Sequence, residues 1–116
     1  MIKYTSVAIV NISKGKMFMK HIENELTEKF FSAILNLESK EECYRFFEDI
    51  CTIKEIQDMS QRLEVAKLLD EGKSYQDILA ITGVSTATIS RVNKCLNYGS
   101  GGYKESISKL KNTEEN

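Results

Sequence analysis

The residues best suited to chemistry lie between Ser74 and Asn97, where hydroxyl side chains, an arginine and a glycine recur at regular spacing. Ser74 and Ser85 each precede a short stretch with helical spacing, and Gly83 stands between the two stretches. A serine before a helix accepts a hydrogen bond from the first unpaired amides, and a glycine adopts the left-handed backbone of a tight turn. Residues 74–97, called the hairpin below, are therefore predicted to form a helix-turn-helix.

The second helix of the hairpin begins with Thr86, Ala87 and Thr88, which are small enough for a helix end to enter a major groove closely. Their hydroxyls can bond base edges or phosphates, and their methyl groups can touch thymine. The free main-chain amides and the positive end of the helix dipole at Ser85 could also bind a phosphate. The basic side chains expected to neutralise the DNA backbone are Lys73, Arg91 and Lys94. The hairpin is expected to bind duplex DNA; a helical module that binds another protein, or a hairpin that only faces solvent, remain alternatives.

The hairpin needs a core that fixes its two short helices. The residues predicted to supply it are Ile78, Leu79, Val84, Ile89 and Val92. Generic helix-turn-helix sequences often have alanine four residues before the turn glycine, where close packing needs a small side chain. Leu79 stands there, so the first helix is expected to sit differently or to lean on a neighbouring element.

The charge distribution is uneven although the formal net charge is only -1. Residues 1–20 carry four lysines and no acid, whereas residues 21–51 carry three basic and eight acidic side chains. Residues 73–111 hold six basic and two acidic side chains, which makes this half of the chain its cationic end. A net charge near zero argues against indiscriminate binding to polyanions, and the cationic end indicates where a specific contact would lie.

Composition excludes several classes of protein. The odd cysteine count without a C-x-x-C pair favours core-facing thiols in a reducing compartment; the cysteines are Cys43, Cys51 and Cys95. His21 lies far from all of them, so neither a zinc site nor another cofactor is expected. The apolar stretch Thr5–Val10 is too short for a secretory signal, and no run is long enough to cross a bilayer. The chain is expected to be cytoplasmic.

An enzyme is not expected either, because no Ser/His/Asp or Cys/His grouping lies in plausible reach. Residues 98–103 hold three glycines in six positions, but they follow a predicted helix and lack the Gly-Lys-Ser/Thr ending of a phosphate loop. They are predicted to form a turn or hinge. A last short helix is expected over Lys104–Lys111.

Helical periodicity and capping signals predict three further helices upstream, and hence an all-α fold. The apolar face of the first comprises Ile22, Leu26, Phe30, Ile34 and Leu37. The second begins at Ser39, which forms a capping box with Glu42. Its predicted buried stripe is Cys43, Phe46, Phe47 and Ile50. The third begins at the capping box of Thr52 and Glu55 and ends at Gly72. Its apolar face is Ile53, Ile56, Met59, Leu63, Val65, Ala66, Leu68 and Leu69.

Three parts follow from these patterns: an N-terminal arm or misassigned start (1–18), a helix-turn-helix domain (19–111) and an acidic disordered tail (112–116). The codons of Lys14 and Gly15 form a purine-rich stretch that resembles a ribosome-binding site upstream of Met17 or Met19. If residues 1–18 belong to the native protein, this basic arm could bind along the phosphate backbone of DNA.

Two stretches carry a family resemblance: Gln61-Arg-Leu-Glu-Val-Ala-Lys-Leu-Leu69 and, inside the hairpin, Ala87-Thr-Ile-Ser-Arg91. Over residues 22–110 the chain resembles the tryptophan-repressor (TrpR) superfamily, most closely its YerC/YecD branch. The stretches that match this branch are Glu42-Cys-Tyr-Arg-Phe-Phe47, Ala87-Thr-Ile-Ser-Arg-Val92 and Cys95-Leu-Asn-Tyr-Gly99. The resemblance implies a bacterial DNA-binding transcription regulator, expected to be a repressor.

The resemblance also implies a homodimer of six-helix protomers, in which the first three helices and the last interlock between chains. Burial between chains is physically reasonable because a thin protomer hides little aromatic surface. The aromatic residues concerned are Phe30, Phe31, Tyr44, Phe46 and Phe47. A monomeric core that uses the same residues is the alternative.

Two hairpins related by a two-fold axis predict a pseudo-palindromic operator with half-sites ~34 Å apart. By motif match, the groove-facing residues are Gln76, Thr86, Ala87, Thr88 and Ser90. Gln76 and Leu79 stand where the tryptophan repressor has basic residues, so its particular operator is not the expected target.

The family's corepressor is an indole held between two arginines and against a glycine. Arg91 matches one arginine, while Gln61, with Arg62 adjacent, stands at the other. Val92 replaces the glycine and is expected to intrude on the indole's space. These four residues mark a candidate effector pocket that is not expected to bind L-tryptophan tightly.

Overall fold

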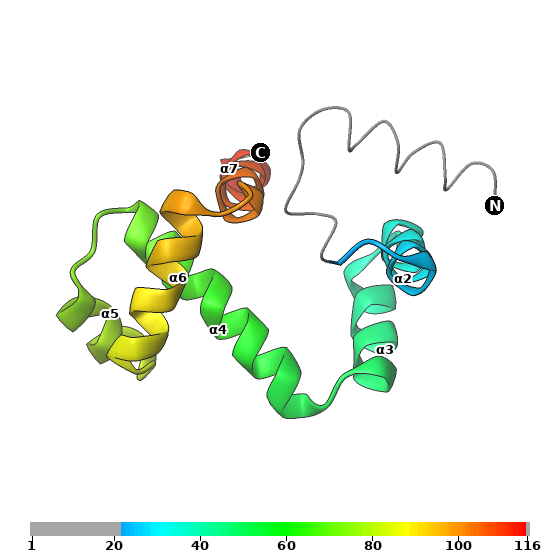
Figure 1. Ribbon diagram of the computed structural model, residues 1–116, viewed down its shortest axis with the longest axis horizontal. Helices are drawn as coiled ribbons and strands as arrows, with labels where there is room; N and C mark the ends of the chain where they lie inside the picture. Colours follow the sequence, from blue (N-terminus) through cyan, green and yellow to red (C-terminus); the bar gives the residue numbers. More distant parts are fainter. Residues whose placement is uncertain (1–21, 116) are drawn as a thin grey trace. The chain divides into compact units, whose positions relative to one another are not determined.

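The computed structural model describes residues 22–115, which form six α-helices and no strand (Figure 1). In chain order they are α2 (Glu25–Leu35), α3 (Lys40–Ile50), α4 (Ile53–Asp70), α5 (Tyr75–Thr82), α6 (Thr86–Tyr98) and α7 (Gly102–Glu115). The all-α prediction is confirmed. The interpretations of residues 1–18 and of His21 concern positions outside the described range. Within that range, no helix combines the length and the apolar character that a bilayer crossing requires.

Local capping sets where α2 and α3 begin. Asn24 accepts a hydrogen bond from the Thr27 amide and returns one from its own amide to the Thr27 hydroxyl, each 2.9 Å long. This capping box was not predicted, and it starts α2 after Ile22, which lies outside the helix. At α3, Ser39 accepts from the Glu42 amide at 3.1 Å as predicted. The Glu42 carboxylate accepts from the Glu38 amide at 2.9 Å, one residue earlier than expected.

Helices α2 and α3 form a compact unit joined by aromatic side chains. Ring centroids lie 5.5 Å apart for Phe30 and Phe31, 6.2 Å for Phe30 and Phe46, and 5.3 Å for Phe46 and Phe47. No described residue of either helix is fully buried. Two helices can shield only the narrow strip where they touch, so the wider stripe predicted for α3 is wrong at its margins. Ile50 is 51% exposed.

The prediction that the three cysteines face a core is wrong. Cys43 and Cys95 are exposed, and Cys51 is half-buried. Cys43 lies at the margin of the α3 stripe, and Cys95 lies one residue from the buried Leu96 on α6. Successive helical residues are rotated by about 100°, so a neighbour of a core residue commonly faces outward.

Helices α4–α7 form the second compact unit, which contains the buried core. Its members are Val65, Ala66, Leu68, Ile78, Val84, Ile89, Val92, Leu96 and Ile107. The apolar face predicted for α4 is buried only near the C-terminal end of the helix. Toward the other end, Ile53 is 74% and Met59 41% exposed. The hairpin and α7 are therefore anchored on the last turns of α4.

The capping box at the start of α4 gives a pH-dependent contribution to stability. Thr52 accepts from the Glu55 amide at 3.1 Å and donates its own amide to the Glu55 carboxylate at 2.8 Å. Hydrogen bonds from the main chain and then the side chain of Thr52 hold the pKa of Glu55 below its ordinary value of 4.5. A depressed carboxyl pKa adds stability above the unfolded-state value, and this contribution is lost as the pH falls through the folded-state value.

Between about pH 5 and about pH 3, wild-type protein should therefore lose more thermal stability than Glu55→Gln, since glutamine keeps the acceptor but does not titrate. Thermal melts followed by circular dichroism across this range measure the difference. Parallel pH profiles for the two proteins would refute the assignment.

The last helix begins earlier and ends later than Lys104–Lys111, the segment predicted for it. Gly101 has a φ of +93°, and α7 starts at Gly102 and continues to Glu115. Glycine disfavours a helix interior, but at the first turn its cost is small and tertiary packing decides. Buried Ile107 supplies that packing. The helix therefore includes residues that the sequence assigned to an acidic tail.

Candidate nucleic-acid interface

The hairpin is tied to the end of α4 by a short turn. Gly72 has a φ of +87°, and the Lys73 amide donates to the Leu68 carbonyl at 3.0 Å, which closes α4 in the manner of a Schellman motif. Ser74 then accepts from the Asp77 amide at 3.1 Å and caps α5. The predicted end of α4 and the predicted start of the hairpin are both confirmed.

The turn between α5 and α6 depends on the backbone of Gly83. Its φ is +72°, its amide donates to the Leu79 carbonyl at 2.8 Å, and an added Cβ would meet nothing within 4 Å. Conformation, and not space, therefore favours glycine here. Thr82, which the sequence analysis missed, also holds the turn. Its hydroxyl donates to the Ile78 carbonyl at 2.7 Å and accepts from the Val84 amide at 3.1 Å.

The hairpin core contains four of its five predicted members. Ile78 and Ile89 are 0% exposed, Val92 is 1% and Val84 is 8% exposed. Leu79 is 42% exposed, so its prediction as a core residue is wrong. Ile78 is the residue of α5 that faces the core, and Leu79 is rotated by about 100° from it, which places Leu79 outside that face.

The first turn of α6 presents small side chains around its cap. Ser85 accepts from the Thr88 amide at 3.2 Å and donates its hydroxyl to the Thr88 hydroxyl oxygen at 3.1 Å. Thr88 is half-buried, whereas Thr86 and Ala87 are exposed. Thr88 therefore supports the cap, and Thr86 and Ala87 are the residues that this helix end offers to a partner.

The remaining residues predicted to contact DNA are exposed on the surface of the α4–α7 unit. They are Lys73, Gln76, Ser90, Arg91 and Lys94. Among the described residues, Lys73, Arg91 and Lys94 have no ion-pair partner. The cationic side chains in and beside the hairpin are therefore available to an external anion.

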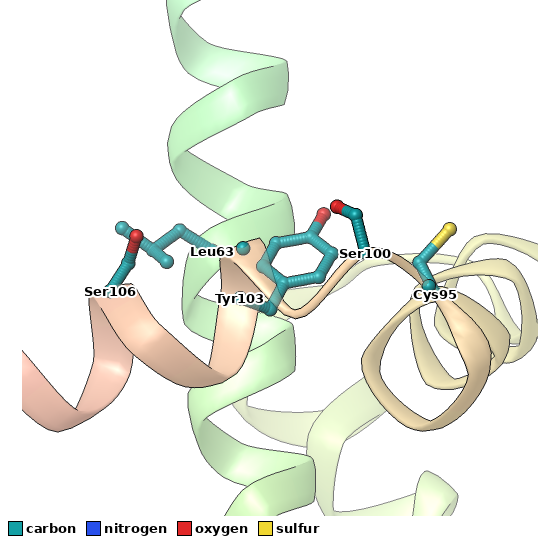
Figure 2. A pocket seen from close by; sticks show the side chains of 7 residues that line it. Leu63, Cys95, Ser100, Tyr103 and Ser106 are labelled. Atoms are coloured by element: carbon teal, nitrogen blue, oxygen red, sulfur yellow. The ribbon is translucent and has the colours of Figure 1, made fainter. Parts of the chain in front are cut away.

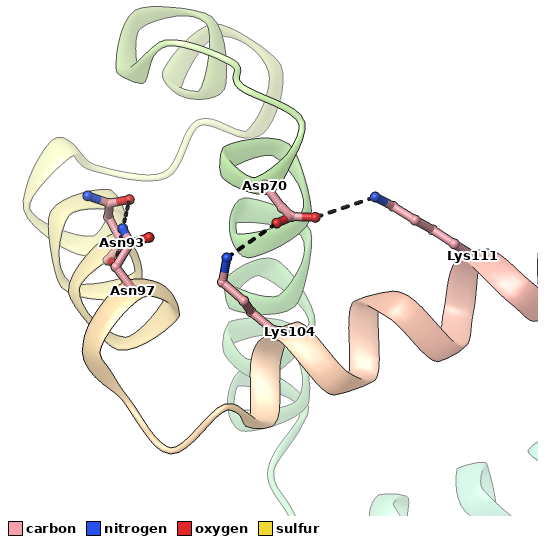
Figure 3. A network of polar contacts seen from close by, with 5 residues as sticks. All are labelled: Asp70, Asn93, Asn97, Lys104 and Lys111. Atoms are coloured by element: carbon pink, nitrogen blue, oxygen red, sulfur yellow. Dashed lines mark hydrogen bonds and ion pairs between the residues drawn. The ribbon is translucent and has the colours of Figure 1, made fainter.

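Two lysines of the cationic end are engaged within the unit instead. The Nζ atoms of Lys104 and Lys111 lie 3.9 and 3.4 Å from the two carboxylate oxygens of Asp70, respectively (Figure 3). Asp70 is the last residue of α4, so the ion pairs link α7 to the end of α4, just before the turn that leads into the hairpin. Charge counting along the sequence could not separate these two lysines from Lys73, Arg91 and Lys94.

The four residues of the candidate effector pocket have different surroundings. Gln61 and Arg91 are exposed, and Arg62 is half-buried. Val92 is 1% exposed and belongs to the core. Across residues 22–115, no group of three His, Cys, Asp or Glu side chains could hold a metal ion.

A hollow of about 440 Å³ lies between α4, the end of α6 and the start of α7 (Figure 2). It is lined by Leu63, Cys95, Gly99, Ser100, Gly102, Tyr103 and Ser106. None of the four residues of the candidate effector pocket is among them. The glycine-rich segment 98–103 therefore contributes to a surface hollow as well as to the turn.

Comparison with known proteins places the chain among related sequences and folds. The profile of the Trp repressor protein family matches residues 24–111. The uncharacterized protein YerC of Bacillus subtilis is 55% identical over 87 residues, which are 75% of this chain and 84% of that protein.

Two crystal structures share the fold. A TrpR like protein from Eubacterium eligens superposes with a TM-score of 0.76 at 52% identity, over 78% of this chain and 94% of that one. A protein from Staphylococcus aureus superposes with a TM-score of 0.77 at 43% identity. The match covers 80% of this chain and 93% of the Staphylococcus aureus chain.

Proposed function

The chain belongs to the Trp repressor family, and from this premise we propose that it is a transcription regulator, acting as a repressor, that binds duplex DNA as a homodimer. The observation that carries the proposal is the start of α6, where exposed Thr86 and Ala87 follow the Ser85 cap on a hairpin with a buried core. A rigid helix end with small polar side chains fits the way such hairpins enter the major groove. The family is a regulatory one, and the proposal assigns the chain no catalytic role.

The residues in and beside the hairpin have separate roles in the proposal. Thr86, Ala87 and Ser90 read base edges in the major groove, with Gln76 of α5 at its margin. Ser85 and Thr88 fix the N-terminus of α6, whose free main-chain amides bind a phosphate. The cations that contact the DNA backbone are Lys73, Arg91 and Lys94. Backbone contacts set position and affinity, whereas base contacts set sequence preference.

The homodimer is supported by large apolar side chains that a single protomer leaves exposed. Leu35 is 84%, Leu26 76%, Ile53 74% and Tyr44 74% exposed. Their burial against a second copy would stabilise the pair by roughly 25 cal/mol for each Å² of apolar area. Two-fold symmetry then repeats the hairpin, and the operator becomes pseudo-palindromic with half-sites ~34 Å apart.

The regulator is further proposed to act without L-tryptophan. Val92 packs in the core beside Ile89 and Leu96, so α6 is held in place by the chain's own side chains. A ligand shifts a conformational equilibrium only if it binds the two conformations with different affinities. Because buried contacts already hold α6 in one position, an indole would change the position of α6 little. A DNA target and exposed thiols also agree with the cytoplasmic location predicted from the sequence.

Selection of bound sequences from a random duplex pool, run with and without L-tryptophan, tests this function. The expected result is enrichment of a two-fold-symmetric site, with equal affinity in both conditions. An asymmetric site would contradict the homodimer, and tryptophan-dependent affinity would contradict the effector assignment. Absence of any enriched duplex would instead favour a module that binds protein.

A further inference from the structure

Helix α6 carries its residues in lines of distinct chemistry. Positions three or four apart share one face of a helix. The buried line is Ile89, Val92 and Leu96. An uncharged polar line comprises Thr86, Ser90, Asn93 and Asn97, and a mixed line with both cations comprises Ala87, Arg91, Lys94 and Tyr98. At about 100° per residue, the mixed line lies opposite the buried line, and the uncharged line lies between the two.

The two asparagines of the uncharged line form a local pair. The side-chain amide of Asn97 donates to Oδ1 of Asn93 and to the main-chain carbonyl of Asn93, both at 3.0 Å (Figure 3). Because Oδ1 of Asn93 is turned toward Asn97, the NH₂ group of Asn93 points the other way. Asn97 is exposed and Asn93 is half-buried. The pair therefore presents an oriented amide donor at the surface of α6.

The length of the uncharged line indicates what this donor meets. Asn93 lies seven residues, or ~10 Å, beyond Thr86 along the helix, and the major groove of B-DNA is ~12 Å wide. If Thr86 lies in the groove, Asn93 therefore lies near the groove edge, where phosphates lie. Asparagine side chains are common hydrogen-bond donors to phosphate oxygens.

We propose that Asn93 and Asn97 form an uncharged phosphate-binding pair, in which Asn93 donates to a DNA phosphate and Asn97 is the positioning residue that orients its amide. This inference rests on the proposed function and extends its contact surface beyond the residues identified from the sequence. An uncharged donor releases no extra counterion of its own, so its contribution persists as salt rises. This chemistry suits a chain whose hairpin offers few cations.

The test measures binding to one duplex as a function of salt for wild type, Asn93→Ala, Asn97→Ala and the double variant. Asn93→Ala should weaken binding about tenfold at every salt concentration, with the slope of log K against log salt unchanged. Asn97→Ala should weaken binding similarly, and the double variant no further, because Asn97 acts through Asn93. Asn93→Asp keeps the acceptor for Asn97 but replaces the donor with a carboxylate, and it should weaken binding more than alanine does.

Lys94→Gln is the matched control on the neighbouring line. It should reduce the slope by about two in a homodimer, since each protomer loses one charged phosphate contact. Thermal melts verify that each variant is folded. Wild-type affinity in Asn93→Ala and Asn93→Asp would overturn the phosphate contact, and multiplicative losses in the double variant would overturn the positioning role. Absence of salt-dependent binding by wild type would refute the proposed function itself. The variants test the asparagine pair separately, because their effects are measured relative to wild-type binding.

Discussion

Replacing Ile78 by alanine is expected to lower the free energy of unfolding by about 2–5 kcal/mol, the usual cost of truncating a buried aliphatic side chain. Ile78 is 0% exposed in the core that α4, α5 and α6 share, and its carbonyl accepts the Thr82 hydroxyl bond that holds the turn. The cavity would remove contacts from both helices of the hairpin. Chemical denaturation of wild type and variant, followed by circular dichroism, measures the loss.

Ile81→Ala is the matched control, because Ile81 lies on the same helix but is 58% exposed. Its truncation should change the unfolding free energy by about 0.5 kcal/mol or less. DNA affinity should fall with Ile78→Ala and persist with Ile81→Ala, since the core holds the helix end that reads DNA. Equal destabilisation by the two substitutions would contradict the hairpin core described above.

Gly99→Ala is expected to destabilise the protein by about 1–3 kcal/mol through a steric conflict. A Cβ at Gly99 would collide with the main-chain carbonyl of Cys95, the group that accepts the hydrogen bond from the Gly99 amide at 2.9 Å. The last turn of α6 would have to open, and the start of α7, which places Ile107 in the core, would shift with it. Thermal melts and hydrogen exchange at the α6–α7 junction report both effects.

Gly102→Ala provides the contrast within the same segment. A Cβ there would meet only the Ser100 hydroxyl at 3.9 Å, and alanine favours helix more than glycine does. We expect no loss of stability, or a small gain, at this position. If both substitutions proved neutral, the close approach at Gly99 would not constrain the junction.

The helix boundaries that the sequence predicted correctly are those set by local chemistry. Thr52, Ser74 and Ser85 cap their helices with side-chain oxygens that bond amides three residues ahead. Gly72 and Gly83 have the positive φ angles that the turns need. Such signals involve neighbouring residues alone, so they can be read without knowledge of the rest of the fold.

Burial was harder to predict, because periodicity shows which residues share a face but not how much of that face another element covers. The prediction succeeded for Ile78 and Ile89, which face the centre of the core. It failed for Leu79 and Cys43 at the margins, which require knowledge of the packing partner. The proposed second protomer would be such a partner for the exposed apolar faces.

For the candidate interface too, features set by local sequence were predictable, whereas contacts between side chains were not. Thr86, Ala87 and Arg91 are exposed, and the prediction that they contact DNA rested on the cap and on helical spacing. The Asn93–Asn97 pair was missed, although its i, i+4 spacing and its place on the line of Thr86 could have indicated it. An asparagine at a helix surface has no distinctive sequence signal until its hydrogen bonds are known.

A salt titration of wild-type binding to duplex DNA tests the central claim, that the hairpin binds DNA through charged backbone contacts, most directly. Three cations in each of two protomers predict that log K falls with log salt with a slope of about -5 between about 50 and about 200 mM. Arg91→Ala should reduce that slope by about two, because each protomer loses one contact. A slope near zero, or no binding to duplex DNA even at about 50 mM salt, would contradict the account.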